Sequence, residues 1–188
     1  RYSYKDAFQR TRQLANALKD LQFKRGDRIA TLAWNDYRHF ELYYAISCSG
    51  QICHTINPRL FPEQIEFIIN HAEDKLIFTD PMFIPLLEAL KSRLPTVEGY
   101  VVLTSEQNMP DCTLENVHCY ETFISEHSEE FDWPSLDENT ASTMCYTSGT
   151  TGNPKGVVYS HRSTVLHSLV GSLPDAMNLS GSDVIMPI

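Results

Sequence analysis

The chain has 188 residues, of which 42% are hydrophobic and 21% charged, and its formal net charge is -9. These proportions are those of a globular protein with a packed core. An acidic balance without a basic stripe argues against a nucleic-acid-binding surface, and no apolar run approaches the length needed to span a bilayer. The sequence starts at Arg1 and stops at Ile188 inside an expected strand, so we expect it to be part of a longer protein.

The cysteines are odd in number and contain no C-x-x-C pair. This pattern indicates neither a disulfide framework nor a zinc site. We expect small, buried, reduced thiols and a cytoplasmic protein. The five positions are Cys48, Cys53, Cys112, Cys119 and Cys145.

Helical and strand patterns alternate over residues 1–103. A capping box of Ser3 and Asp6 opens the first helix, whose apolar side runs from Ala7 to Leu21. We expect further helices over residues 35–48, 62–71 and 81–90, and strands over residues 28–33, 51–56, 75–79 and 100–103. This alternation predicts βαβ units, and therefore an α/β fold with parallel-rich sheets flanked by helices.

Residues 104–138 break this rhythm, because they are polar and acidic with scattered aromatic residues. We expect a long irregular connection there, with one short helix over residues 120–125. Regular structure returns with a strand from Ala141, a glycine-rich loop and a second strand. A helix from His161 to Met177 and a final strand from Val184 to Ile188 are expected to follow.

The stretch from Tyr146 to Val157, YTSGTTGNPKGV, holds five hydroxyl side chains, three glycines and one lysine. Glycines let the backbone approach a ligand closely, and the N–H groups and hydroxyls of such a turn form an anion-binding concavity. A lysine adds a compact positive charge of the kind used on phosphates. This combination predicts a loop that binds a polyphosphate.

The Walker A loop, G-x-x-x-x-G-K-[ST], does not fit this stretch. Gly149 and Gly152 are too close together, and Pro154 rather than a glycine precedes Lys155. Walker A also leads into a helix, whereas the residues after Lys155 favour a strand. We therefore expect the loop to join two strands. A P-loop NTPase, which needs a helix directly after the lysine, is a rival interpretation from another class.

All twelve positions resemble the phosphate-loop signature of the acyl-adenylating (AMP-forming) superfamily. This group includes acyl-CoA synthetases, peptide-synthetase adenylation domains and beetle luciferases. The resemblance implies that residues 1–188 are part of an N-terminal AMP-binding domain, with βαβ units in 1–103, a connection in 104–138 and the phosphate-loop region in 139–188. The family's C-terminal domain, with a lysine that completes adenylation, is absent from this sequence, so we expect these residues alone to be inactive.

The resemblance places the phosphates of ATP on this loop. Lys155 would be the catalytic residue, because a cation there stabilises the negative charge that accumulates on the leaving pyrophosphate. Thr147 would also help to hold Mg²⁺. The residues that would bind ATP are Thr147, Ser148, Gly149, Thr150, Thr151, Gly152 and Lys155.

Two further segments, HTINPRL at residues 54–60 and FELYYA at residues 40–45, resemble the subgroup that activates medium- and long-chain fatty acids. Related sequences in that subgroup include ligases for short thioether acids. The implied activity is conversion of a carboxylic acid to acyl-AMP and then acyl-CoA, with ATP, Mg²⁺ and coenzyme A. Adenylation of an aryl acid or an amino acid is the alternative within the family. A non-catalytic nucleotide-binding protein is a further rival.

Small molecules are therefore the expected partners, namely the acid, ATP and coenzyme A, and nucleic acid is not. A lipid substrate would allow peripheral association with a membrane, and a homodimer is compatible with the sequence.

The remaining polar residues carry simpler interpretations. His161 and Arg162 are expected to form the polar start of a helix. A solvated face near a helix end is expected for Glu63, Glu66, Glu73 and Asp74. No metal-like spacing relates the other histidines, which are His39, His54, His71, His118, His127 and His167.

Overall fold

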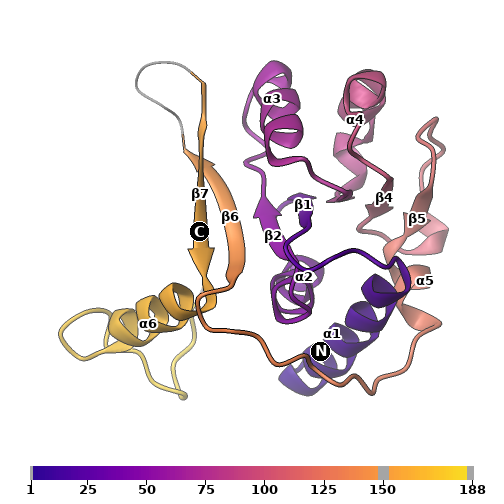
Figure 1. The fold of residues 1–188 in the computed structure, drawn as a ribbon. Coiled ribbons are helices and arrows are strands. Elements are labelled where there is room, and N and C mark those ends of the chain that lie inside the picture. The colour runs from indigo at the N-terminus through magenta and orange to yellow at the C-terminus, as the bar shows by residue number, and fades with distance from the viewer. Residues whose placement is uncertain (1, 148–152, 186–188) are drawn as a thin grey trace.

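The computed structural model describes residues 2–147 and 153–185, and these form an α/β fold (Figure 1). The helices are α1 (Tyr4–Asp20), α2 (Tyr37–Cys48), α3 (Pro62–Ala72), α4 (Ile84–Leu90), α5 (Tyr120–Ser125) and α6 (His161–Ser172). The strands are β1 (Arg28–Leu32), β2 (Ile52–Thr55), β3 (Leu76–Thr79), β4 (Gly99–Val102), β5 (Val117–Cys119), β6 (Ala141–Thr147) and β7 (Lys155–Ser160). Short 3₁₀ turns cover Pro81–Phe83, Lys91–Arg93 and Glu106–Asn108.

Within the described residues the strands form one sheet in the order β5-β4-β3-β1-β2-β6-β7. All neighbouring strands are parallel except β6 and β7, which are antiparallel. Every residue of β3 and β4 is buried, as expected for parallel strands covered on both faces. The predicted fold class, a parallel-rich sheet flanked by helices, is confirmed.

Helices cover the two faces of the parallel part of the sheet. On one face, α3 and α4 contribute Ile65, Ile69 and Leu87 to a buried cluster with residues of β1, β3 and β4. The other face packs against α1, α2 and α5, and its cluster includes Leu14 and Ile46. Figure 1 shows these two sets of helices above and below the sheet, with β6 and β7 standing beside them.

The helix starts follow from local capping. The Ser3 side chain accepts a hydrogen bond from the Asp6 backbone N–H at 3.3 Å, and the Ser3 N–H donates to the Asp6 carboxylate at 2.7 Å. Asp36 likewise caps α2 by accepting from the His39 N–H at 2.9 Å. These contacts satisfy N–H groups that have no partner inside the helix, and the first of them confirms the predicted capping box.

The expected irregular connection over residues 104–138 contains a strand that the sequence pattern did not indicate. Strand β5 pairs with β4, and Val117 lies opposite Tyr100. Only Cys119 of its three residues is buried, so the segment lacks the apolar run that marks an interior strand. Its pairing with β4 therefore depends on tertiary contact. The short helix predicted over residues 120–125 is confirmed as α5.

Two expectations for the C-terminal part are wrong. The helix predicted to reach Met177 ends at Ser172, and Leu173 is extended, with φ -62° and ψ 156°. Pro174 explains this end, because the residue before a proline is disfavoured in the helical region. Val184 and Ile185 do not form the expected strand, and neither pairs with a strand among the described residues. Residues 186–188 lie outside the described part.

None of the described helices is both long and apolar enough to cross a membrane. All five cysteines carry free thiols, and Cys53 and Cys119 are buried. The expectation of buried thiols is right for these two and wrong for the other three, since Cys48, Cys112 and Cys145 are only partly buried.

Candidate functional site

The predicted phosphate loop joins two strands, as expected. Strands β6 and β7 pair in antiparallel register, with Thr147 opposite Lys155 and Tyr146 opposite Gly156. Strand β7 begins at Lys155 itself, so no helix follows the lysine as a Walker A loop would require. Residues 148–152, which include five of the predicted ATP-binding positions, lie outside the described residues: Ser148, Gly149, Thr150, Thr151 and Gly152.

Thr147 and Lys155 therefore form the last described pair before the loop. Both side chains are exposed, and within the described residues Lys155 makes no ion pair and no hydrogen bond through its ammonium group. An exposed lysine and a threonine hydroxyl at the mouth of a glycine-rich loop can reach an anion without first breaking protein contacts. The hairpin thus has a cation and a hydroxyl at the end that carries the loop.

Tyr146 joins the loop end of this hairpin to the rest of the domain. Its hydroxyl lies 2.6 Å from Nδ1 of His71 on α3, and its ring centroid lies 5.3 Å from that of His54 on β2. A Cβ atom on Gly156 would come within 3.1 Å of Cζ of Tyr146. Glycine at position 156 therefore leaves the space that the tyrosine ring needs, directly beside Lys155.

A buried His–Asp pair lies beneath Tyr146. Both His54 and Asp74 have side chains with 0% exposure, and Nδ1 of His54 lies 2.8 Å and 2.9 Å from the two carboxylate oxygens of Asp74. Burial raises the pKa of Asp74, and the hydrogen bond from His54 acts in the opposite direction. A buried carboxylate without such a donor would be strongly unfavourable.

The expectation of a solvated face was wrong for Asp74. The other three carboxylates do face solvent or an exposed partner: Glu63 and Glu73 are exposed, and Glu66 pairs with Arg93 at 2.7 Å. Asp74 differs because Glu73 has a left-handed backbone with φ 54°, and the chain turns inward after it. No charge pattern distinguishes Asp74 from its neighbours, so only the backbone turn could have revealed the pair.

His161 and Arg162 form the polar start of α6, as predicted. Ser160 caps the helix by accepting from the Ser163 N–H at 3.1 Å. Arg162 binds Glu138 twice, through its backbone N–H at 2.7 Å and its guanidinium at 2.8 Å. These contacts hold the end of β7 that is remote from Lys155.

An apolar groove of about 570 Å³ lies at that remote end. Its lining includes Tyr4, Phe8, Phe40, Tyr44, Trp133 and His161. His161 follows the last residue of β7, so the length of that strand, roughly 17 Å, separates the groove from Lys155. The groove is therefore not part of the predicted phosphate site.

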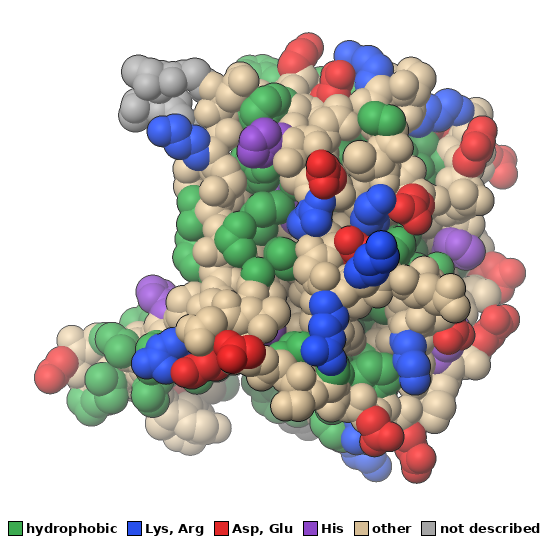
Figure 2. Space-filling view, in the orientation of Figure 1, with side chains coloured by type: hydrophobic (Ala, Val, Ile, Leu, Met, Phe, Trp, Pro, Cys, Tyr) green, Lys and Arg blue, Asp and Glu red, His purple; other side chains and the backbone are tan. Residues whose placement is uncertain are grey.

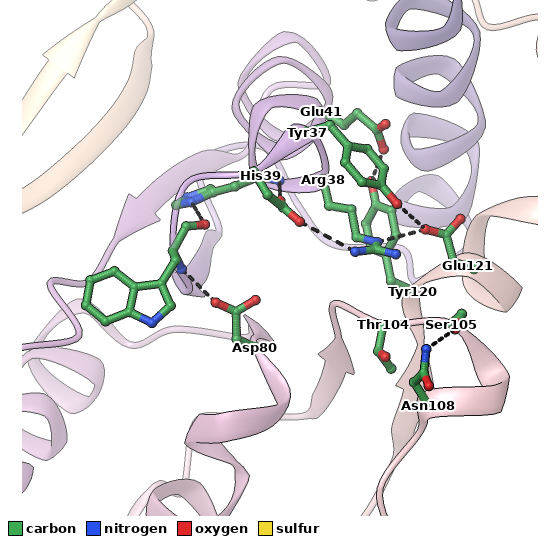
Figure 3. Close-up of polar contacts among 12 residues, drawn as sticks. Tyr37, Arg38, His39, Glu41, Asp80, Thr104, Ser105, Asn108, Tyr120 and Glu121 are labelled. Carbon is green, nitrogen blue, oxygen red and sulfur yellow. Dashed lines mark hydrogen bonds and ion pairs between the residues drawn. The ribbon is translucent and has the colours of Figure 1, made fainter. Parts of the chain in front are cut away.

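A second group of polar residues lies at the carboxyl edge of the parallel strands, where ligands often bind in open α/β sheets (Figure 3). Asp80, just after β3, accepts a hydrogen bond from the Trp34 N–H at 2.7 Å, and His39 lies 3.2 Å from the Trp34 carbonyl. Nearby, Glu121 accepts from Arg38 at 2.7 Å. Because these groups bind one another, their arrangement ties loops and helices together and offers few free partners to a ligand.

Within residues 2–147 and 153–185, no three His, Cys, Asp or Glu side chains gather into a group that could hold a metal ion. Thr147 contributes one neutral oxygen at the hairpin. Mg²⁺ commonly keeps several waters and binds substrate phosphates with few protein ligands. The hairpin therefore fits a Mg²⁺ that is held mainly by phosphates, and it does not fit a metal held by protein side chains alone.

Acidic and basic side chains are interspersed over the face shown in Figure 2, with several Lys and Arg side chains near its middle.

Comparison with known proteins decides the family. Residues 1–188 match the family described as AMP-binding enzyme. The chain belongs to this family. A medium-chain-fatty-acid–CoA ligase of Ectopseudomonas oleovorans is 48% identical over 188 residues, which are 100% of this chain and 34% of that protein. A 3-methylmercaptopropionyl-CoA ligase of Ruegeria pomeroyi is 50% identical over 177 residues, which are 94% of this chain and 33% of that protein.

The fold of this AMP-binding family member also has solved counterparts. The anthranilate CoA ligase AuaEII, crystallised with anthranoyl-AMP, superposes with a TM-score of 0.82 at 24% identity over 88% of this chain and 31% of that one. The chain thus spans about a third of the length of the relatives it matches.

Proposed function

We propose that the protein to which these residues belong is an AMP-forming acid–thiol ligase. It would convert a carboxylic acid, ATP and coenzyme A to acyl-CoA, AMP and pyrophosphate. The observation that carries this proposal is the β6–β7 hairpin, which sets Thr147 opposite Lys155 at the ends of the YTSGTTGNPKGV loop. The names of the two relatives that share about half of its residues support the same reaction.

Two displacements make up the reaction. A carboxylate oxygen attacks the α-phosphorus of ATP, the bond to the bridging oxygen breaks, and pyrophosphate leaves. The sulfur of coenzyme A then attacks the carbonyl carbon of the acyl-adenylate, the thiol proton passes to solvent, and AMP leaves. In the first step the departing phosphates gain negative charge. Lys155 and the loop hydroxyls, aimed at those phosphates, would stabilise that charge more than the ground state.

The proposed ligands of ATP are Thr147, Ser148, Gly149, Thr150, Thr151, Gly152 and Lys155. When bound, Mg²⁺ neutralises charge on the phosphates, and Thr147 would supply one oxygen to it. The protein's own contribution is the placement of Lys155 on a paired strand, which holds its Cα opposite that of Thr147. A residue on a strand is held more rigidly than one in a free loop.

We infer a fatty acid of medium or long chain as the substrate. The relative from Ectopseudomonas oleovorans carries the name of a medium-chain ligase, and the relative from Ruegeria pomeroyi is named for a short thioether acid. Aryl-acid or amino-acid adenylation is the alternative. A panel of acids from 3-methylmercaptopropionate to palmitate, with benzoate and amino acids, separates these by acid-dependent AMP release.

We further propose that residues 1–188 form part of an N-terminal AMP-binding domain and that a C-terminal domain completes the catalytic site. The segment alone would then show no ATP–pyrophosphate exchange. A reducing compartment such as the cytoplasm suits the five free thiols. Peripheral association with a membrane through the lipid substrate, and a homodimer, are further proposals that vesicle flotation and sedimentation can test.

The decisive experiment is ATP–pyrophosphate exchange by the full-length protein with each acid of the panel. We expect acid-dependent exchange and AMP release. A P-loop NTPase would instead release ADP and phosphate, and the strand that begins at Lys155 is unfavourable to it. A protein that binds ATP but shows neither exchange nor AMP release with any acid would overturn the proposal in favour of a non-catalytic nucleotide-binding protein.

A further inference from the structure

Tyr146 lies next to both residues that flank the phosphate loop, Thr147 and Lys155. It immediately precedes Thr147 on β6, and its Cα partner on β7 is Gly156, which immediately follows Lys155. The position of the Tyr146 side chain therefore bears on both strands at the point where the phosphate loop begins and ends.

Two residues of other elements hold that side chain. His71 near the end of α3 lies 2.6 Å from the phenol oxygen through Nδ1, with the two rings edge to face at 87°. The His71 ring is itself stacked on Phe67 one turn earlier, with ring centroids 5.3 Å apart. His54 on β2 lies against the Tyr146 ring. The tyrosine is thus bound from its tip and packed along its face.

His54 is in turn fixed by Asp74. Both side chains have 0% exposure, and Nδ1 of His54 contacts both carboxylate oxygens. Nε2 of His54 is buried and has no hydrogen-bond partner among the described residues. A carboxylate can only accept, so Nδ1 of His54 is the donor of its hydrogen bond to Asp74. This arrangement locks the orientation of the ring that supports Tyr146.

We propose that Tyr146, His71, His54 and Asp74, here called the tyrosine anchor, are positioning residues that set the hairpin, and thereby Lys155 and Thr147, for the adenylation step. This inference rests on the proposed ligase activity. No member of the anchor needs to touch ATP. Their effect is geometric, because misplacement of a reacting group by about 1 Å can cost on the order of 10²-fold in rate.

The anchor predicts different effects on the two half-reactions. Adenylation uses the phosphate loop, whereas transfer of the acyl group from acyl-AMP to coenzyme A involves neither the β- nor the γ-phosphate. The test compares Tyr146→Phe with wild type in the full-length protein, first in ATP–pyrophosphate exchange and then in thioester formation from supplied acyl-AMP. We expect kcat for exchange to fall about 2- to 10-fold, which is the effect of one hydrogen bond, while thioester formation is unchanged.

His71 offers a rescue experiment. His71→Leu removes the partner of the phenol and should lower exchange as Tyr146→Phe does. The double variant should then be no worse than either single variant, since both remove the same bond. His71→Asn keeps a polar atom near the place of Nδ1 and should recover part of the lost activity. Tyr100→Phe on β4 is the matched control, because Tyr100 is buried and burial alone, with no side-chain hydrogen bond, raises the pKa of its phenol.

The outcomes separate the two proposals. If wild type shows no acid-dependent exchange with any acid, the ligase proposal fails. If wild type is active but Tyr146→Phe matches Tyr100→Phe, the tyrosine anchor has no positioning role and only this inference fails. Equal losses in both half-reactions, or a lower melting temperature with unchanged kinetics, would mean a merely structural role and would also overturn it.

Discussion

Thr147 and Lys155 are Cα partners at the end of the antiparallel ladder between β6 and β7. The two residues therefore approach each other across the base of the loop, although 148–154 separate them in the sequence. A hydroxyl and a cation at the two ends of one loop are groups that can bind a polyphosphate. Because β7 starts at the lysine, backbone pairing of the strands and not a helix N-terminus sets the place of the charge.

Substitution of the lysine should slow adenylation. In the full-length protein we expect Lys155→Ala to lower the rate of ATP–pyrophosphate exchange by about 10²- to 10³-fold, the usual effect of losing one donor that stabilises transition-state charge. Thioester formation from supplied acyl-AMP should change little. Lys5→Ala, at an exposed lysine of α1, is the control. Unchanged exchange in Lys155→Ala would remove the lysine from the proposed mechanism.

The packing of Tyr146 against Gly156 gives a second prediction. Gly156→Ala places a methyl group 3.1 Å from Cζ of Tyr146, so the ring must give way by a few tenths of an ångström while bonded to His71. Overpacking of this kind costs about 1–3 kcal/mol, and we expect a lower melting temperature together with slower exchange. Gly181→Ala serves as the control, since a Cβ there meets nothing within 4 Å. If both alanine variants behave alike, the contact does not constrain the hairpin.

Removal of His54 should destabilise the fold. His54→Leu leaves the buried Asp74 carboxylate without its donor, at a cost of about 2–4 kcal/mol in the free energy of unfolding. The measurement is the shift in the urea midpoint at neutral pH. Glu63→Gln, at an exposed carboxylate of α3, should change the midpoint by less than about 0.5 kcal/mol. A His54→Leu protein as stable as Glu63→Gln would show that the pair contributes nothing.

The raised pKa of Asp74 should make the free energy of unfolding depend on pH. Burial raises its pKa in the folded state above the ordinary value of 3.8, so the folded state binds a proton that the unfolded state has released. Its contribution to stability is therefore largest below pH 3.8 and is lost as the pH rises through the folded-state pKa. Asp74→Asn keeps an acceptor for His54 but cannot ionise, so its stability should not fall in this way as the pH rises. We expect the free energy of unfolding of the variant, minus that of wild type, to become more positive as the pH rises above 3.8 in urea titrations. A difference in the free energy of unfolding that does not change with pH would contradict the raised pKa.

Cysteine labelling tests whether strand β2 is packed away from solvent. Burial of Cys53 raises the pKa of its thiol to about 12, so almost no thiolate forms at pH 8. We expect iodoacetamide to label Cys53 far more slowly than the half-buried Cys112, and to label both at similar rates in urea. Peptide mass spectrometry follows each site. Rapid labelling of Cys53 in the folded protein would mean that β2 is open to solvent.

Local patterns were sufficient for most of the fold. The capping box of Ser3 and Asp6 and the alternating helical and strand patterns predicted α1 to α5 and β1 to β4, because each of these signals acts within a few residues. The hairpin at residues 141–160 was also predictable, since β-branched residues flank the loop. The end of α6 was not, although the Pro174 that ends it was visible in the sequence.

The elements missed by local patterns depend on distant partners. Strand β5 has too few buried residues to be noticed before β4 is placed beside it. Asp74 looks like a surface carboxylate until the left-handed turn at Glu73 directs it toward His54. Tyr146 belongs to the signature, but its bond to His71 joins residues that are 75 positions apart.

The sequence alone determined the family signature, with its lysine and hydroxyls, and the order of most helices and strands. These are local properties, written in side-chain type and spacing. The tertiary structure decided how the signature is held, by packing Tyr146 on a buried His–Asp pair and by aligning Thr147 with Lys155. Such contacts form only when strands far apart in the chain share one sheet, so no short stretch of residues can specify them.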